Sequence, residues 1–218
     1  MFFYSKSMNG DNILPESGYY LVTLRPHTFG VLLGTNNERA LIISLLQDIL
    51  TSRSLLEESS THTKLASHID LLAFSILKEG IQLVVFSIAK SSLTILGELI
   101  ILQLGLYYSE YEPNAFQNKH FVKPTTSIRQ LIGPHDALKA SVQLHCNHPD
   151  WEFDRYSSIG FFLHDRRGDW VRLWRLSYLY ENNTNNYRQL MELALRDTLT
   201  KATRSIITTG PYATLKHE

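Results

Sequence analysis

The sequence predicts an α+β domain: an antiparallel sheet of about four or five strands, packed against helices and followed by a C-terminal helical extension. Residues 72–85 contain two apolar runs joined at Lys78-Glu79-Gly80, a pattern typical of an antiparallel hairpin. Apolar residues recur with helical spacing on both sides of this hairpin, over 35–49 and 93–108. A length of 218 residues fits one large domain, or a main domain with an extension.

The composition is that of a globular protein with neutral overall charge. Hydrophobic residues make up 44% and charged residues 19% of the chain, which is enough apolar material for a real core. The 21 basic and 21 acidic residues cancel. Proteins that bind DNA usually carry a basic surplus, because cations displace the counterions of the phosphates. The balance therefore argues against a strongly basic surface, but it leaves room for a local basic face.

Several features favour a soluble, cytoplasmic protein with no membrane association. Cys146 has no second cysteine to pair with, which suits a reducing compartment. Residues 1–6 do not begin a signal peptide, since no long apolar run follows a basic start. The most apolar stretch, 69–108, contains no uncharged run of the ~18 residues that a membrane helix needs. Its charged interruptions include Lys78, Glu79, Lys90 and Glu98.

The first third of the chain predicts a loose arm, a strand and a helix. Residues 1–18 are polar and mixed and form the expected arm. The aromatic and β-branched segment 19–25 ends before Pro26 and is expected to be a strand. Thr35-Asn36-Asn37-Glu38 is typical of a helix start, and residues 59–63 of a loop. The buried face of the helix is expected to hold Leu41, Leu45, Leu46 and Ile49.

A second helix is expected to begin near Ser91-Ser92 and to run from Leu93 to about Tyr108. Its apolar residues cover nearly the whole circumference, so both sides of the helix require a cover. Two interpretations remain open. The helix is either sandwiched within the fold or forms the contact of a homodimer or another protein partner.

The second half of the chain predicts further helices. Residues 114–123 suggest a loop and a strand. A helix is expected from about Ser127 to His145, with a break where Pro134 follows Gly133. From Asp169 onward the pattern is again helical. One face of this last part contains Tyr187, Leu190, Met191, Ala194 and Leu195. The expected domain boundaries are 19–150 for the α+β domain and 151–218 for the helical extension.

Several short segments resemble the REP-associated tyrosine transposases. The hairpin at 72–85 is similar to the family segment Ala-Tyr-Val-Leu-Met-Pro-Asn-His-Val-His-Leu-Leu-Leu. Phe116-Gln117 and Tyr156-Ser157-Ser158 match two further family motifs, and His145-Cys146-Asn147-His148-Pro149 is similar to the helix end Tyr-Ile-His-Leu-Asn-Pro. The resemblance covers about residues 19–200 and rests on element order, spacing and these matches. It implies a ferredoxin-like fold and a relationship to enzymes of DNA transposition that cut single-stranded DNA at the foot of a hairpin.

The residues that perform the chemistry in that family are replaced here. The resemblance places the metal-binding histidine pair at Gly80 and Gln82, and neither side chain is a good ligand for a divalent cation beside phosphate. It places the nucleophilic tyrosine four residues before Asn147, at Gln143, and an amide cannot form a phosphotyrosine-type intermediate. We therefore expect a protein without catalytic activity, metal or cofactor.

Other residues could in principle supply chemistry. Tyr107, Tyr108 and Tyr111 could act as a displaced nucleophile in an active nuclease, although aromatic packing is the commoner role. His145 and His148 have the i, i+3 spacing of a metal pair. A hydrogen-bonded structural histidine is the favoured interpretation of His145.

With the catalytic residues replaced, binding is the function left to consider, and two basic clusters in the sequence are candidates for it. The first cluster is a short basic strand, which the resemblance places near single-stranded or hairpin DNA. The second cluster interleaves cations with tryptophans, and such a mixture can bind single strands. Equally, the second cluster could be a solvated turn and an amphipathic helix. The alternative function is a protein-interaction module, or a homodimer through the helix at Leu99–Tyr108, without a role in nucleic-acid binding. The candidate DNA-binding residues are Lys119, His120 and Lys123 in the first cluster, and Arg166, Arg167, Arg172 and Trp174 in the second.

Overall fold

The computed structural model describes residues 17–25, 33–51, 61–111, 124–147 and 150–209. Residues 1–16 of the expected N-terminal arm and the expected loop and strand at 114–123 lie outside these residues, while Gly18, expected in the arm, already opens a strand. The elements in chain order are β1 (Gly18–Arg25), α1 (Asn36–Thr51), α2 (Thr61–His68), β2 (Ile69–Leu77), β3 (Gly80–Ser87), α3 (Lys90–Tyr111), β4 (Thr125–Leu131), α5 (Pro134–His145), the 3-10 turn η1 (Trp151–Phe153), α6 (Ile159–Phe162), α7 (Trp174–Ser177), the 3-10 turn η2 (Tyr178–Tyr180) and α8 (Thr184–Thr209).

The described strands form a single antiparallel sheet. Its order is β2-β3-β1-β4, and every neighbouring pair is antiparallel. A helical segment connects β1 to β2 and another connects β3 to β4, so the chain follows the β-α-β-β-α-β order of the ferredoxin-like arrangement. The expected α+β class is confirmed, with four strands.

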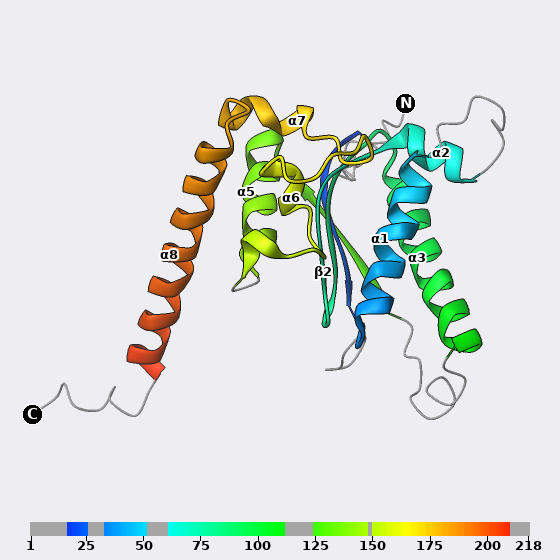
Figure 1. Cartoon of the computed structure of the whole chain (residues 1–218), viewed down its shortest axis with the longest axis horizontal. Coiled ribbons are helices and arrows are strands. Elements are labelled where there is room, and N and C mark those ends of the chain that lie inside the picture. The colour runs from blue at the N-terminus through cyan, green and yellow to red at the C-terminus, as the bar shows by residue number, and fades with distance from the viewer. Residues whose placement is uncertain (1–16, 26–32, 52–60, 112–123, 148–149, 210–218) are drawn as a thin grey trace, which may run out of the picture.

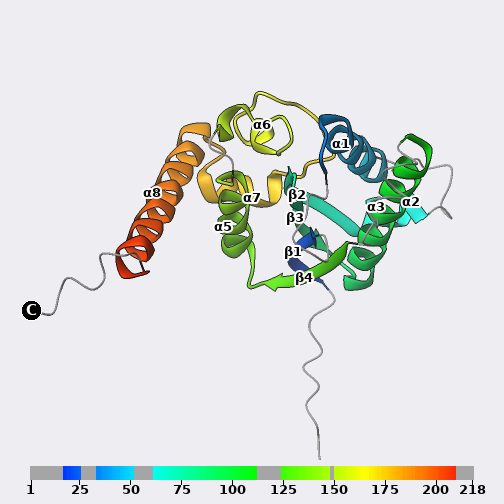
Figure 2. The ribbon, with the colours of Figure 1, turned by 90° about the horizontal axis from the view of Figure 1, so that it is seen from below.

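The sheet separates two helical layers (Figures 1 and 2). Helices α1, α2 and α3 lie on one side, and α5 lies on the other, with α8 outside it. This division follows from the alternation along β1, where Tyr20 and Val22 belong to the α1 and α3 core, while Tyr19 and Leu21 pack toward α5. Each sheet face therefore has its own apolar core.

The chain after residue 150 is hydrogen-bonded to the edge of the sheet. The backbone N–H of Ile76 in β2 donates to the Tyr156 carbonyl at 2.9 Å, and isolated bridges join Ser75 to Ser157 and Leu71 to Val171. These contacts cover the outer edge of β2, which would otherwise expose unpaired backbone groups. The expected face of α8 is confirmed, since Tyr187 and Met191 are fully buried.

Helix α1 begins as the sequence predicts, with a reciprocal capping box. The Thr35 N–H donates to the Glu38 carboxylate at 2.8 Å, and the Glu38 N–H donates to the Thr35 hydroxyl at 3.2 Å. The expected buried face was partly wrong, because Ile42 is fully buried and Leu41 is only half-buried. The segment expected to be a loop at 59–63 was also partly wrong, since α2 already begins at Thr61.

The hairpin of β2 and β3 is confirmed, with its turn at Lys78-Glu79. Gly80 opens β3 where the backbone of β1 comes very close. A Cβ atom at Gly80 would lie 2.4 Å from the Leu24 carbonyl oxygen. Since this neighbour is backbone, any side chain at position 80 would force the two strands apart.

The helix expected over 127–145 is correct only in its second part. Thr125–Leu131 is the edge strand β4, paired along its length with β1. Pro134 then opens α5, as its fixed φ and missing N–H favour. The helical spacing of Ile128 and Leu131 arose by chance within an alternating exposure pattern.

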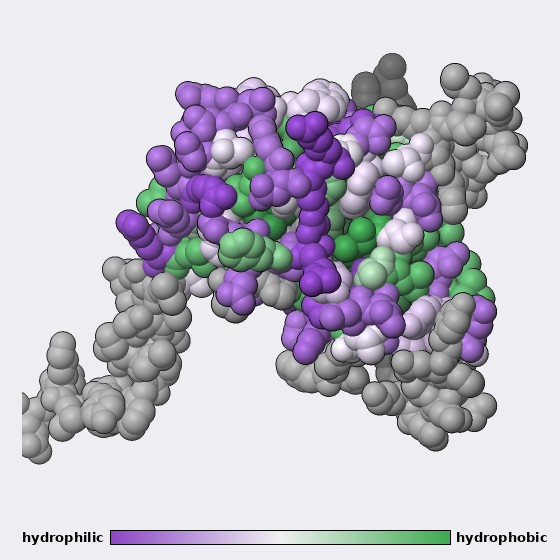
Figure 3. Space-filling view, in the orientation of Figure 1, coloured by the Kyte–Doolittle hydropathy of each residue, from purple (hydrophilic) through white to green (hydrophobic). Residues whose placement is uncertain are grey.

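Helix α3 is not sandwiched inside the fold, so that interpretation was wrong. One face, including Leu96, Ile100 and Leu104, is fully buried on the sheet. The opposite face leaves Leu102 and Leu106 56% and 52% exposed. Apolar surface is visible over this helical layer in Figure 3. Among the described helices, α3 alone is long and apolar enough to span a membrane by length and composition, which is weak evidence because core helices pass the same test.

Candidate functional site

The structure brings Gln82 together with the end of α5. Gln82 lies on β3, half-buried, on the sheet face that α5 covers. The Asn147 side-chain amide, just beyond α5, donates to the Gln82 side-chain oxygen at 3.0 Å. Gln143 lies one helical turn earlier and is exposed. Two of the three positions at which the resemblance expects catalytic residues thus belong to one region of the fold.

Gly80 lies in the same region, but its position leaves no room for a side chain. It precedes Gln82 by two residues on the same strand, so both positions belong to the same sheet face. The carbonyl oxygen of Leu24 occupies the space that a side chain at position 80 would need. The strand geometry around position 80 is therefore built for glycine.

Gln82 belongs to a row of polar residues that crosses the sheet, hereafter the polar row. In the strand register, Gln82 stands opposite Ser75 on one side and opposite Thr23 on the other. Directly opposite residues of antiparallel strands share a face. The row continues past both of these neighbours and consists of Ser157, Ser75, Gln82, Thr23 and Ser127. The sequence shows no sign of this row, because its members come from five separate segments.

His145 is a satisfied structural histidine, as the sequence favoured. It is buried and lies 2.8 Å from the Tyr187 hydroxyl and 2.7 Å from the Ser158 hydroxyl. The Phe74 N–H also donates to the Ser158 hydroxyl at 2.8 Å. A neutral imidazole satisfies every group in this arrangement. The Tyr187 hydroxyl donates to Nδ1 of His145, and Nε2–H of His145 donates to the Ser158 hydroxyl. The Ser158 hydroxyl in turn donates to the Phe74 carbonyl at 3.3 Å. Burial lowers the pKa of His145 to about 3.

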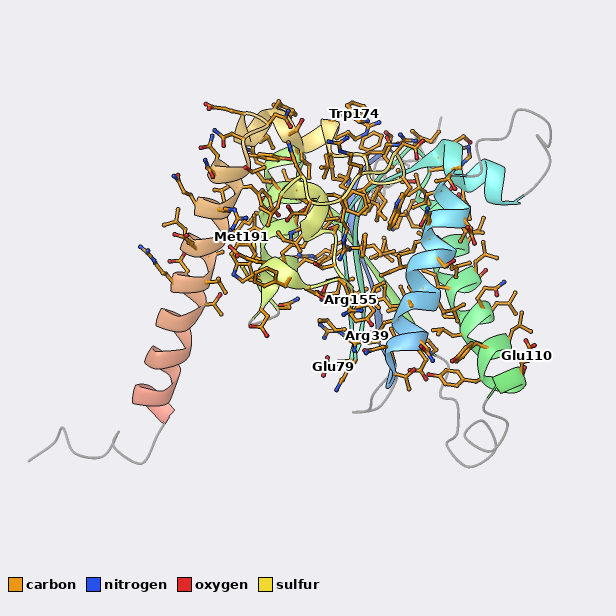
Figure 4. The ribbon with its side chains drawn as sticks, viewed as in Figure 1. Arg39, Glu79, Glu110, Arg155, Trp174 and Met191 are labelled. Carbon is orange, nitrogen blue, oxygen red and sulfur yellow. The ribbon has the colours of Figure 1, made fainter. Side chains whose placement is uncertain are left out.

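The second basic cluster, called here the cation and tryptophan cluster, is largely paired within the protein and consists of Arg166, Arg167, Trp170, Arg172, Trp174 and Arg175. Arg175 donates to the Asp70 carboxylate at 2.6 Å, and Arg172 lies 4.0 Å from the same carboxylate. The Arg175 guanidinium also lies 3.7 Å from the centre of the Phe86 ring and 4.5 Å from that of Trp174. These contacts position both arginines and offset one of their two charges. They leave Trp174, 62% exposed, as the accessible aromatic group of the cluster. Figure 4 shows it near the upper end of the sheet.

Arg166 and Trp170 are held by contacts within the protein. The Arg166 guanidinium donates to the carbonyl oxygens of Arg155 and Ser157 at 2.9 and 3.1 Å. Burial lowers the pKa of Arg166 in this position. Trp170 is buried and stacks on Phe74 with ring centres 5.2 Å apart. In this cluster Arg167 is the arginine with an exposed side chain.

Several other expected residues are placed as follows. Lys119, His120, Lys123 and His148 lie outside the described residues. Tyr107 and Tyr108 are on α3 with their rings in edge contact at 5.9 Å. Within the described part of the chain, no group of three or more histidine, cysteine, aspartate or glutamate side chains could hold a metal ion.

Sequence reasoning missed a second pair of arginines at the opposite end of the sheet from Trp174 (Figure 4). The guanidinium of Arg39 lies 4.1 Å from the centre of the Tyr156 ring, and that of Arg155 lies 6.0 Å from it. Arg39 and Arg155 are far apart in the sequence, so no local motif connects them.

A groove of about 550 Å³ separates α5 from α8. Leu138, Val142 and Leu190 supply apolar lining, and Gln143 and Cys146 also line it. Burial raises the pKa of the Cys146 thiol to about 11, so the thiol stays protonated and unreactive at neutral pH.

Comparison with known proteins identifies no relative. No family model matches the chain, and neither the curated proteins nor the solved structures contain a significant match.

Proposed function

We propose that this protein is a catalytically inactive, transposase-like protein that binds single-stranded or hairpin DNA. The observation that carries the proposal is the contact between Gln82 and Asn147. It places the end of α5 against the strand in which the resemblance expects a metal-binding pair. The ferredoxin-like strand order agrees with the fold that the resemblance implies. The amides at Gln82 and Gln143 support binding without cleavage.

The charge distribution supports moderate rather than strong binding to phosphate. Asp70 already pairs with Arg172 and Arg175, so the three groups carry a net charge of only +1 and would release fewer counterions than two free arginines. Arg129 on β4 and Arg167 are exposed. The net charge of zero adds no general attraction to DNA. Stacking on Trp174 would supply a contribution that depends little on salt.

We expect a labelled DNA hairpin with a single-stranded foot to bind more weakly at about 200 mM than at about 50 mM salt, as measured by fluorescence anisotropy. Arg167→Gln should weaken binding and lower the salt slope by about one. Ser91→Gln, on α3, is the matched surface control and should change neither quantity. Absence of binding at the lower salt concentration would contradict the proposal.

The same hairpin should remain intact when incubated with Mg²⁺ or Mn²⁺. Cleavage that disappears in Tyr107→Phe or Tyr111→Phe would instead establish an active nuclease with a relocated tyrosine. Cleavage that persists in both variants would also contradict an inactive protein.

The outer face of α3 supports a second candidate function, a homodimer or protein-interaction module. Ile95 and Leu102 lie two helical turns apart, Leu106 lies one turn beyond Leu102, and all three are exposed. A stripe of this kind on an outer helix commonly meets another protein.

We expect a dimer of this kind to dissociate when the stripe becomes charged. Sedimentation velocity of the wild type should show a concentration-dependent dimer, and Leu102→Lys/Leu106→Lys should sediment as a monomer. Leu193→Lys, an exposed leucine on α8, is the control and should leave the dimer unchanged. A wild type that stays monomeric at all concentrations would exclude the homodimer.

A further inference from the structure

The polar row contains one buried hydroxyl group, that of Ser75, which the described residues leave without a hydrogen bond, whereas the Ser157 hydroxyl donates to the Asp154 carbonyl. Ser75 is fully buried, and its hydroxyl oxygen has no partner among the described residues. Leaving a buried hydroxyl unpaired is unfavourable. An apolar or alanine side chain would pack at this position without that cost. The strip of sheet around Gln82 is thus more polar than stability alone would favour.

The amide pair at the centre of the row presents an unused hydrogen-bonding edge. Asn147 donates one N–H to the oxygen of Gln82. This leaves the Gln82 NH₂ group as a donor and the Asn147 oxygen as an acceptor, with no other partner among the described side chains. If the oxygen and nitrogen of both amides were exchanged, Gln82 would donate to Asn147 instead. The pair would still have one free donor group and one free acceptor. The pair therefore offers a neighbouring donor and acceptor, with Asn147 exposed to solvent.

This edge is suited to a neutral, planar ligand. Side-chain amides make bidentate hydrogen bonds with nucleobase edges, which carry adjacent donors and acceptors. A phosphate group would find no cation in the row itself, because its five members are hydroxyls and one amide. A base edge is available to the protein only where the base is unpaired, as in a single strand or a hairpin loop.

Arg129 stands at a suitable place for the neighbouring phosphate. It follows Ser127 by two residues on β4, so its side chain leaves the same face of the sheet. Two strand spacings and two residues separate it from Gln82, roughly 12 Å between Cα atoms. Arg129 is exposed and has no ion-pair partner among the residues that the structure describes.

We propose that the Gln82–Asn147 amide pair binds the edge of an unpaired nucleobase, while Arg129 contacts the phosphate backbone of the same strand. This inference rests on the proposed function and adds to it where the strand lies and what holds the base.

The test measures, by fluorescence anisotropy at about 50 mM salt, how tightly the wild type and each amide variant bind two ligands. The ligands are a labelled deoxyadenosine strand of about 12 nucleotides and an abasic strand of equal length and charge. Asn147→Ala should bind the adenosine strand about 5- to 150-fold more weakly than the wild type does. It should bind the abasic strand with the same affinity as the wild type. Gln82→Ala provides a second, independent variant, and a thermal melt followed by circular dichroism checks that each is folded.

Arg129→Gln is the matched variant for the phosphate contact. It should weaken binding of both strands by the same factor and reduce the salt slope by about one. Equal binding of the adenosine strand by wild type, Asn147→Ala and Gln82→Ala would overturn the base contact while leaving DNA binding intact. Failure of the wild type to bind either strand would overturn the proposed function together with this inference.

Discussion

Lowering the pH from 7 to 4.5 is expected to remove about 2.5 kcal/mol of folding free energy through His145 alone. Burial lowers the pKa of His145 from 6.5 to about 3 in the folded protein. The unfolded chain therefore binds a proton that the folded chain rejects. The stabilisation is complete above pH 6.5 and is lost as the pH falls toward 3, by about 1.4 kcal/mol for each pH unit.

Urea denaturation at pH 7 and pH 4.5 measures this loss, and His145→Gln separates it from the titration of carboxylates. The variant should be less stable at pH 7, because Tyr187 and Ser158 lose their shared partner. Its stability should fall less steeply with pH than that of the wild type. Tyr187→Phe keeps the histidine and should retain the steep dependence. Identical pH slopes in the wild type and His145→Gln would contradict a neutral buried imidazole.

The two tryptophans of the cation and tryptophan cluster are expected to differ sharply when each is replaced by alanine. Trp170→Ala should cost about 3–5 kcal/mol of unfolding free energy, because Trp170 fills a buried space against Phe74 and Phe161. Trp174→Ala should cost about 0.5 kcal/mol or less, since the side chain is 62% exposed.

Urea denaturation of the two variants under the same conditions checks this difference. If Trp174 also stacks on DNA, Trp174→Ala should weaken hairpin binding about 5- to 150-fold at almost unchanged stability. Equal destabilisation by both substitutions would show that the cluster is not divided into a buried and an exposed tryptophan.

Local sequence signals predicted the elements whose formation depends on their own residues. The hairpin followed from two apolar runs around a short turn, α1 from its capping box, and the start of α5 from Pro134. β4 was missed because Ile128 and Leu131 have helical spacing in a short segment. Its pairing with β1 decides its conformation, and that pairing joins residues far apart in the chain.

The candidate site was predictable only in part. The resemblance indicated Gln82 and Gln143, but the hydrogen bond from Asn147 to Gln82 depends on how α5 docks on the sheet. The partners of Arg166, Arg172 and Arg175 were equally hidden, because ion pairs and carbonyl contacts form between segments distant in sequence.

By itself, the sequence determined the α+β class, the hairpin, the positions at which several elements begin, and the absence of histidines at Gly80 and Gln82. These properties depend on residue identity and on neighbours within a few positions. The tertiary structure alone decided which face of α3 is exposed, that His145 is buried among hydroxyls, and that the polar row crosses the sheet. Each of these depends on strand register and helix docking, which place side chains from separate segments at hydrogen-bonding distance.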